Sequence, residues 1–226
     1  EVNIDGTFNV YLAAKEAGVK RVVYAASSSA YGDTDVLPKV ETMLPRPKSP
    51  YAVQKLLGEY YAGAFSSCFG LEAVALRFFN VYGPRQDPKS EYAAAIPRFT
   101  TRLLQGQRPI VFGDGLQTRD FVHISDVVRA NLLAATSDKA PGEVVNVASG
   151  VSSSLIDLIA TLKQVIGSSA AGLEIEHQAP RAGDLRESSA DISKARAVLG
   201  YAPRVQLKEG LAGVVEFFRG VKVKAA

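Results

Sequence analysis

The stretch KRVVYAASSS, residues 20–29, is a short apolar run that ends in three serines. An apolar run of this length, rich in β-branched residues and without strict alternation, is typical of a buried strand in a parallel sheet. Further strands are expected at 72–80 and 143–148, and helices at 1–17, 50–67 and 125–136 lie among them in the sequence. This alternation of strands and helices predicts an α/β fold built on a parallel sheet.

A tyrosine and a lysine follow the serine run at helical spacing. Tyr51 and Lys55 are four residues apart, so they lie one turn apart on the same helix face. Pro50 comes directly before Tyr51, at the position where a helix tolerates proline best. A lysine ammonium beside a phenol favours the phenolate, which allows the tyrosine to take a proton nearer neutral pH. With a serine hydroxyl at the preceding strand end, the pattern predicts proton removal from an alcohol while a hydride leaves the carbon.

The same spacing also occurs where no chemistry is expected. Tyr11 and Lys15 form a second Tyr-x-x-x-Lys pair, but no serine-ended strand precedes them, so they indicate a plain helix face. Tyr51 and Lys55 could be read in the same way without their context. The serine-ended strand favours a site, because ligands of open α/β sheets bind at the carboxyl ends of strands. Capping of the strand end is the structural alternative for the serines.

Eight motifs occur in a defined order over nearly the whole chain. They are Ser27-Ser28-Ser29-Ala30-Tyr31-Gly32, Ser49-Pro50-Tyr51-Ala52-Val53-Gln54-Lys55, Arg77-Phe78-Phe79-Asn80-Val81-Tyr82-Gly83-Pro84-Arg85, Gly113-Asp114-Gly115, Arg119-Asp120-Phe121-Val122-His123, Asn146-Val147-Ala148, Arg181-Ala182-Gly183-Asp184 and Ala190-Asp191-Ile192-Ser193-Lys194-Ala195. In this order they resemble the extended short-chain dehydrogenase/reductases. Within that family they look most like the nucleotide-sugar 4-epimerases that act on UDP-glucose or UDP-N-acetylglucosamine.

The resemblance implies a doubly wound Rossmann-type sheet and a smaller α/β lobe. Residues 1–96 and 121–150 would belong to the NAD-binding domain, and residues 97–120 and 151–226 to the lobe that binds the nucleotide sugar. Members of the family begin with a glycine-rich strand–turn–helix that holds the dinucleotide pyrophosphate. No such motif occurs in this sequence. We therefore expect the sequence to lack roughly the first hundred residues of a complete member, as judged from the size of such domains.

The resemblance also implies roles for individual residues. Tyr51 would be the general acid/base, and Lys55 would lower its pKa and hold the nicotinamide ribose. Ser27 would be the third catalytic residue, with Ser28 or Ser29 as alternatives, and Phe79 would pack beside the nicotinamide. The substrate-binding residues would be Ser27, Ser28, Asn80, Arg119, Arg181, Asp184 and Ser188, with the two arginines on the diphosphate, a group that the forked guanidinium binds well.

The implied reaction is inversion at C4 of a UDP-hexose through a 4-keto sugar, with NAD as the cofactor. A tyrosine at the position of Ser188 is associated with plain hexoses and a small residue with N-acetylated ones. Ser188 therefore favours UDP-N-acetylglucosamine and UDP-N-acetylgalactosamine over UDP-glucose and UDP-galactose. Dehydratases of the family carry two acids where this chain has Ser28 and Ser29, so dehydration is disfavoured. A decarboxylase is disfavoured too, because the glutamate usual in that turn is missing. A reductase of the same fold and a non-catalytic binding protein are the alternatives.

Composition limits the other classes of function. The 226 residues are 47% hydrophobic and 22% charged with a net charge of +3, which is ordinary for a globular protein. The basic residues are scattered, so no nucleic-acid partner is expected. No apolar run reaches membrane-spanning length, and the two histidines, His123 and His177, are too far apart in sequence to suggest a metal site.

Two further expectations concern location and assembly. Cys68 is the single cysteine, which excludes an intramolecular disulfide and agrees with a reducing, cytoplasmic location. The resemblance implies a homodimer in which helices 1–17 and 50–67 pack against their counterparts. Burial of the same apolar side chains within one chain is the alternative.

Overall fold

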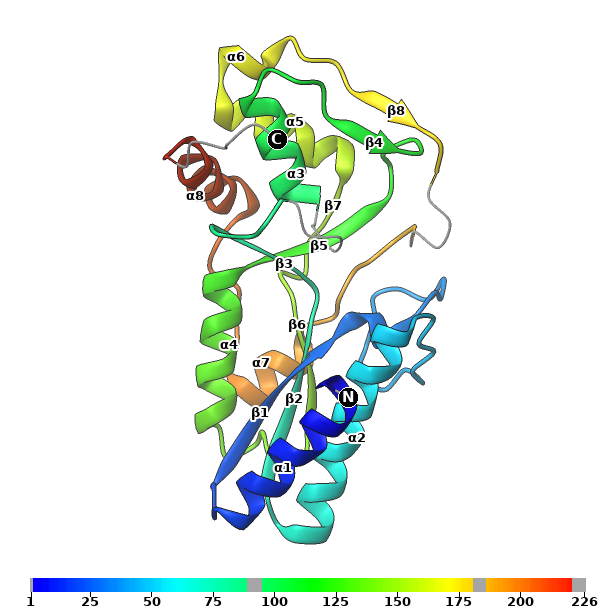
Figure 1. Ribbon diagram of the computed structural model, residues 1–226, viewed down its shortest axis with the longest axis vertical. Coiled ribbons are helices and arrows are strands. Elements are labelled where there is room, and N and C mark those ends of the chain that lie inside the picture. The colour runs from blue at the N-terminus through cyan, green and yellow to red at the C-terminus, as the bar shows by residue number, and fades with distance from the viewer. Residues whose placement is uncertain (1, 89–94, 181–185, 221–226) are drawn as a thin grey trace.

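The computed structural model describes residues 2–88, 95–180 and 186–220 and has two lobes (Figure 1). Its helices are α1 (Thr7–Glu16), α2 (Pro50–Phe69), α3 (Ala95–Leu104), α4 (Ile124–Thr136), α5 (Leu155–Ile166), α6 (Ser168–Ala171), α7 (Ser193–Leu199) and α8 (Leu207–Gly220), with a π-helical turn η1 at Val2–Gly6 and a 3-10 turn η2 at Ser28–Tyr31. Its strands are β1 (Arg21–Ser27), β2 (Glu72–Phe78), β3 (Asn80–Tyr82), β4 (Ile110–Phe112), β5 (Thr118–His123), β6 (Val144–Val147), β7 (Ser152–Ser154) and β8 (Glu176–Gln178).

The parallel strands β1, β2 and β6 form the sheet of the first lobe, in the order β1-β2-β6. Ser27 pairs with Phe78, and Phe78 pairs with Val147, so the three strands end side by side. Helices α1 and α2 lie on one side of this sheet and α4 on the other (Figure 1). An α/β fold with helices on both faces is what the sequence pattern and the resemblance predict, and it is confirmed.

Strand β1 is less buried than its sequence predicts. Five of its seven residues in a row, from Arg21 to Ala25, are only partly buried or exposed, whereas the middle of β2 is fully buried. The reason is position, because β1 is at the edge of the three strands that pair in the described part of the chain. The prediction of a buried strand is therefore wrong for β1 within the described part of the chain.

Helix α2 carries the predicted Tyr/Lys face and has well-formed ends. Ser49 Oγ accepts a hydrogen bond from the Ala52 backbone N–H at 3.1 Å, and Pro50 occupies the first helical position. Gly70 ends the helix in the left-handed conformation with φ of 69°, which glycine adopts without steric cost. The helix start is thus set by local sequence, and Tyr51 is placed in its first turn.

A short second sheet joins the two lobes. Strand β3 is parallel to β5, and β7 is antiparallel to β5 (Figure 1). The second lobe beyond it contains α3, α5, α6 and α8 around a separate apolar core, with the parallel pair β4 and β8 at its side. The buried members of this core include Ile96, Phe99, Leu103, Leu158, Leu162, Leu211, Val214 and Phe218.

Residues 190–201 pack into the core of the first lobe. Ala190, Ile192, Ala195, Leu199 and Tyr201 are buried in one cluster with residues of β2 and β6. The expectation grouped this segment with the substrate lobe, whose boundaries stay a prediction. The packing shows that the chain returns to the first sheet after β8 before it reaches α8.

The structure contains elements that sequence patterns missed. The sequence patterns did not predict strands β3 and β7, which are three residues long. They also did not predict the 3-10 turn η2 or the short helix α6. The sequence Ser125-Asp126 at the start of the expected helix 125–136 is typical of a helix cap, but this prediction is wrong for α4. His123 is the N-cap, and its Nδ1 accepts a hydrogen bond from the Ser125 backbone N–H at 3.3 Å. Buried Asp126 instead accepts backbone hydrogen bonds from Arg204 and Val205, so it holds the segment that leads into α8.

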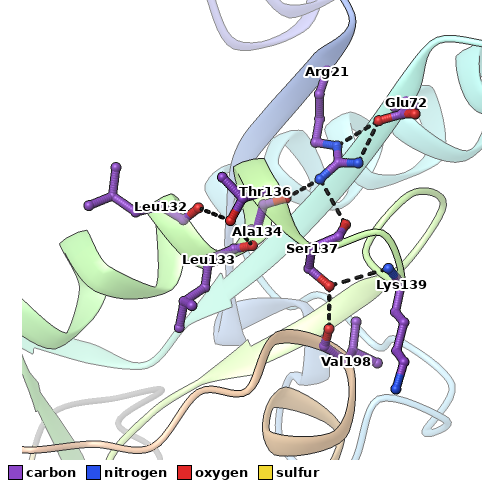
Figure 2. Close-up of polar contacts among 9 residues, drawn as sticks. All are labelled: Arg21, Glu72, Leu132, Leu133, Ala134, Thr136, Ser137, Lys139 and Val198. Carbon is purple, nitrogen blue, oxygen red and sulfur yellow. Dashed lines mark hydrogen bonds and ion pairs between the residues drawn. The ribbon is translucent and has the colours of Figure 1, made fainter.

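Arg21 joins three elements at the amino ends of β1 and β2 (Figure 2). Its Nε and Nη2 donate to Glu72 Oε2 at 2.8 and 2.6 Å, and its Nη1 donates to the carbonyls of Ala134 and Ser137 at 3.0 and 2.8 Å. These carbonyls belong to the last turn of α4, where backbone acceptors lack helical partners and a cation is favourable. One guanidinium therefore ties α4 to the sheet.

Replacing Arg21 by methionine should destabilise the protein by about 2–3 kcal/mol, because Glu72 and two α4 carbonyls lose their donor. The measurement is urea unfolding of the full-length protein. Lys48→Met is the control, since the Lys48–Asp33 pair is exposed and is expected to contribute about 0.5 kcal/mol or less. Equal losses in the two variants would contradict the role given to Arg21.

The His123 cap predicts a pH dependence. Burial lowers the pKa of the imidazole below its ordinary value of 6.5, although Asp126 and Glu209 oppose this. Below pH 6.5 the unfolded chain therefore binds a proton that the folded chain resists, and stability falls as the pH falls. His123→Asn keeps a capping acceptor without titrating. Wild type should thus lose stability relative to His123→Asn between pH 7.5 and 5 in urea unfolding. Parallel curves for the two proteins would rule the idea out.

Candidate active site

The predicted site forms where β1 ends and α2 begins. Lys55 Nζ donates a hydrogen bond to the carbonyl of Ala25 at 2.9 Å, which ties the second turn of α2 to the end of β1. The same nitrogen lies 5.9 Å from the centroid of the Tyr51 ring. Tyr51 is 42% exposed, so its ring is accessible from solvent. Strand, serine run, tyrosine and lysine thus converge at the carboxyl edge of the sheet.

The surroundings of Lys55 combine a partly buried ammonium with a nearby phenol. Burial lowers the pKa of its ammonium below the usual value. A cation near the Tyr51 ring stabilises a phenolate more than a phenol. The arrangement can therefore assist removal of a proton by Tyr51.

Tyr24 is a second phenol beside Lys55 that sequence reasoning missed as a site residue. Lys55 Nζ lies 5.5 Å from the centroid of the Tyr24 ring. Burial raises the pKa of Tyr24 to about 12, so its hydroxyl stays protonated near neutral pH. The ring rests on Gly58 of α2, where a Cβ would lie 2.1 Å from Tyr24 Cζ. Of the two phenols, Tyr51 is the more exposed.

The serines form a small hydrogen-bonded group at the strand end. Ser27 is the last residue of β1 and the N-cap of η2, and its Oγ accepts from the Ser29 backbone N–H at 3.2 Å and from Ser29 Oγ at 2.9 Å. Ser27 therefore has the capping role that was given as the structural alternative. It leaves chemistry possible, because an oxygen that accepts two hydrogen bonds still has its own proton to donate. Ser28 is the first residue of η2.

Three of the predicted substrate residues lie along β5. Asn80 Nδ2 donates to the Asp120 carbonyl at 3.1 Å, and Arg119 is on β5 itself, with its Nη1 donating to the Thr118 carbonyl at 2.7 Å. The Ser188 backbone N–H donates to the same Thr118 carbonyl at 3.1 Å. Residues that are far apart in sequence are therefore brought to one strand. Arg181 and Asp184 lie outside the residues that the structure describes.

Ser188 and Phe79 are more enclosed than the other candidates. Ser188 is only 8% exposed, and its carbonyl accepts from Ser152 Oγ on β7 at 2.7 Å. Phe79 is 6% exposed and packs in the core of the first lobe, with its ring 6.3 Å from that of Tyr31. Most of the Phe79 surface is thus covered by protein, and its contact with a nicotinamide stays a prediction.

Asp120 organises the loops around this strand and was not predicted. It is completely buried and accepts hydrogen bonds from the Ser149 backbone and hydroxyl, both at 2.7 Å, and from the Gly150 backbone at 2.9 Å. Burial raises its pKa, and these hydrogen bonds oppose the rise. An acid flanked by Arg119 in a short strand gave no sequence signal for this role, because the residues that it binds lie 29 and 30 positions away.

The long loop after the serines connects with the segment that carries Ser188. Lys39 forms a parallel bridge with Ala190, in which its backbone N–H donates to Ser189 at 2.8 Å and its carbonyl accepts from Asp191 at 3.0 Å. The Pro-rich loop 33–48 is thereby fixed beside residues 188–191.

The side chains present determine which cofactor the site could hold. Tyr51 and Lys55 supply the hydroxyl and ammonium donors that would suit the ribose end of NAD. The glycine-rich cradle for its pyrophosphate does not occur in this sequence. Among the described residues, no three His, Cys, Asp or Glu side chains gather in a way that could hold a metal ion. None of the described helices combines the length and apolar character that crossing a membrane would need.

The arrangement has counterparts among known proteins. The family model described as the NAD dependent epimerase/dehydratase family matches residues 1–148. A UDP-glucose 4-epimerase of Mycolicibacterium smegmatis is 42% identical over 219 residues, which are 96% of this chain and 68% of that protein. The structure of a UDP-N-acetylglucosamine 4-epimerase from Methanobrevibacter ruminantium, in complex with UDP-N-acetylmuramic acid, superimposes with a TM-score of 0.91 and 37% identity, covering 96% of this chain and 69% of that one.

Other relatives have different substrates. A UDP-glucuronic acid 4-epimerase from Bacillus cereus, solved with UDP-glucuronic acid and NAD, has a TM-score of 0.87 and 34% identity, covering 96% of this chain and 67% of that one. A dTDP-glucose 4,6-dehydratase of Actinoplanes is 35% identical, over 96% of this chain and 66% of that protein. The name of each of these proteins contains a nucleotide sugar. The chain belongs to the NAD dependent epimerase/dehydratase family.

Proposed function

We propose that this protein is an NAD-dependent epimerase that inverts C4 of a UDP-hexose, with UDP-N-acetylglucosamine and UDP-N-acetylgalactosamine as the favoured pair. The observation that carries the proposal is the hydrogen bond from Lys55 Nζ to the carbonyl of Ala25, two residues before Ser27, with the same nitrogen 5.9 Å from the centroid of the Tyr51 ring. The family supports the cofactor and the general reaction.

In the proposed reaction Tyr51 takes the proton of the sugar 4-hydroxyl and Ser27 donates a hydrogen bond to the same oxygen. Lys55 stabilises the Tyr51 phenolate and holds the ribose of the dinucleotide. NAD, when bound, supplies the hydride acceptor and donor for C4. Tyr51 returns its proton to the oxygen of the 4-keto sugar after the sugar has turned over. A proton transfer of this kind needs a base within hydrogen-bond reach whose pKa matches the working pH.

The sugar can turn only if its diphosphate is held. Arg119 on β5, Asn80 at the start of β3, Arg181 and Asp184 are the proposed anchors for the UDP part. The direct link between Asn80 and β5 supports a common surface for these groups. Guanidinium groups bind diphosphate oxygens through paired donors, which fixes one end of the substrate and leaves the hexose free to rotate.

Some relatives are dehydratases, but the residues of η2 argue against dehydration by this protein. A 4,6-dehydratase needs acids beside the strand-end hydroxyl, and this chain has Ser28 and Ser29 there. A neutral serine hydroxyl cannot provide that acid/base pair near neutral pH. The epimerase is therefore preferred over the dehydratase.

We further propose a homodimer formed through α1 and α2. These helices have exposed apolar or aromatic side chains at Val10, Val53, Tyr60 and Phe69, which are between 51% and 61% exposed. Burial of such side chains against a second copy would be favourable.

Replacing Tyr51 by phenylalanine should reduce epimerisation by about 100-fold or more, because the general acid/base is lost. The assay is formation of UDP-N-acetylgalactosamine from UDP-N-acetylglucosamine by the full-length protein without added cofactor. Tyr11→Phe is the matched control, since it removes a phenol from the other Tyr-x-x-x-Lys pair and should leave turnover nearly unchanged. Undiminished turnover in Tyr51→Phe would contradict the mechanism. A net change in free NADH or NADPH during turnover would instead indicate a reductase.

The substrate preference predicts the effect of a larger side chain at Ser188. Ser188→Tyr should lower kcat/KM for UDP-N-acetylglucosamine about tenfold or more relative to UDP-glucose, because the ring occupies space for the acetamido group. Glu187→Tyr adds the same ring at an exposed neighbouring position and should leave the ratio unchanged. If Ser188→Tyr lowers the values for both sugars equally, Ser188 is a packing residue.

A further inference from the structure

A buried ion pair joins helix α2 to strand β2. Arg77 donates from Nε to Glu59 Oε1 at 2.9 Å and from Nη2 to Glu59 Oε2 at 2.7 Å. The two side chains are only 4% and 3% exposed. Two parallel hydrogen bonds between planar groups restrict both distance and orientation, which a single contact or an apolar one does not.

The pair lies next to both parts of the proposed active site. Glu59 follows Lys55 by four residues and Tyr51 by eight, so all three lie on one face of α2. Arg77 pairs in the sheet with Ala26, directly before Ser27. The ion pair therefore spans from the Tyr/Lys face of the helix to the strand end that carries the catalytic serine.

The contacts continue from Arg77 through Tyr31. The guanidinium carbon of Arg77 lies 4.7 Å from the centroid of the Tyr31 ring, which fits a cation–π contact. Tyr31 Oη donates to Asn146 Oδ1 at 2.6 Å. Tyr31 ends η2, the turn that begins after Ser27, and Asn146 is in β6. Arg77 thus holds the serine turn as well as the helix.

Asn146 extends the connection to the loops. Its Nδ2 donates to the carbonyls of Lys39 and Asp191 at 3.0 and 3.2 Å, and its backbone N–H donates to Glu41 at 2.8 Å. These residues belong to the bridge that fixes loop 33–48 beside the segment with Ser188. One polar network consequently links α2, β2, the serine turn η2 and β6 with the segments around Lys39 and Asp191.

A buried ion pair such as Glu59–Arg77 is not expected to stabilise the fold more than apolar side chains would. Removing two charges from water costs several kcal/mol, and apolar residues of similar size often stabilise such a position as well or better. Arg77 Nη1 is also buried without a hydrogen-bond partner among the described residues, which adds to the cost. Unlike apolar packing, the two hydrogen bonds between Arg77 and Glu59 define the distance of α2 from the sheet and the rotation of the helix about its axis.

We propose that the Glu59–Arg77 pair, stacked on Tyr31, is the device that positions Tyr51 and Lys55 relative to Ser27. Glu59 and Arg77 are then positioning residues, since neither contacts the substrate. The proposal rests on the proposed function, because the geometry that it explains is that of the proposed catalytic residues. Misplacement of a reacting group by about 1 Å can cost on the order of 100-fold in rate.

The first test compares, in the full-length protein, two glutamates that each bind an arginine of the β1–β2 strand pair. Glu59→Gln should lower kcat about tenfold or more and leave KM within about twofold, because the anchors of the UDP part are elsewhere. Glu72→Gln is the matched control. It weakens the Arg21–Glu72 pair at the opposite ends of β1 and β2 and should lower stability without lowering kcat. Equal effects of the two variants on kcat would overturn the proposal.

The second test separates positioning from stability. The double variant Glu59→Leu/Arg77→Met replaces the pair by apolar side chains and should unfold at a urea concentration close to that of wild type. Its kcat should stay low, and a crystal structure should show α2 displaced by about 0.5 Å or more with the Lys55–Ala25 hydrogen bond lengthened. Recovery of kcat together with stability would show a purely structural pair and would refute positioning.

The crystal structure of the double variant also separates failure of the positioning proposal from failure of the proposed function. If wild type converts no UDP-hexose, the proposed function fails, and positioning is then judged from the structure of the double variant alone. An α2 that keeps its place over β1 in that variant refutes positioning whatever the activity of the wild type.

Discussion

The parallel pairing of β1 with β2 is the constraint on which the rest of the structure depends. Its register aligns Ser27 with Phe78, so the serine turn and the start of β3 leave the sheet at the same edge. Helix α2 connects these two strands in the chain and must lie across them, which brings its first turns to that edge. A shift of register would move the serines, Tyr51 and Asn80 relative to one another, because they extend from these two strands or from their connection.

Charged side chains then fix the helices at the two ends of this strand pair. At the amino end Arg21 binds Glu72 and the last turn of α4. Near the carboxyl end Arg77 binds Glu59 of α2 and stacks on Tyr31. The first pair is partly open to solvent at Glu72, whereas the second is almost completely enclosed. Enclosure removes screening by water, so the geometry of the second pair is more strongly defined.

Hydrogen bonds to backbone groups connect several segments around β5. The Thr118 carbonyl accepts the Ser188 N–H, and Asp120 accepts backbone and hydroxyl donors from Ser149 and Gly150. These bonds bring segments from β5, the β6–β7 loop and the region before α7 to one place. Arg119 and Ser188, which are far apart in sequence, therefore meet at the Thr118 carbonyl. An active site between two lobes gains its substrate contacts in this way.

Local sequence by itself determined the strands and helices that have strong patterns and good caps. The apolar runs of β1 and β2, Ser49 and Pro50 before α2, and the Tyr51/Lys55 spacing are such signals, and the order of motifs revealed the family. Strands β3 and β7 are too short to have a pattern of their own, and the roles of Tyr24, Glu59, Arg77 and Asp120 depend on distant partners. Only the tertiary structure decided these, because a buried polar group is defined by what it binds and not by its neighbours in sequence.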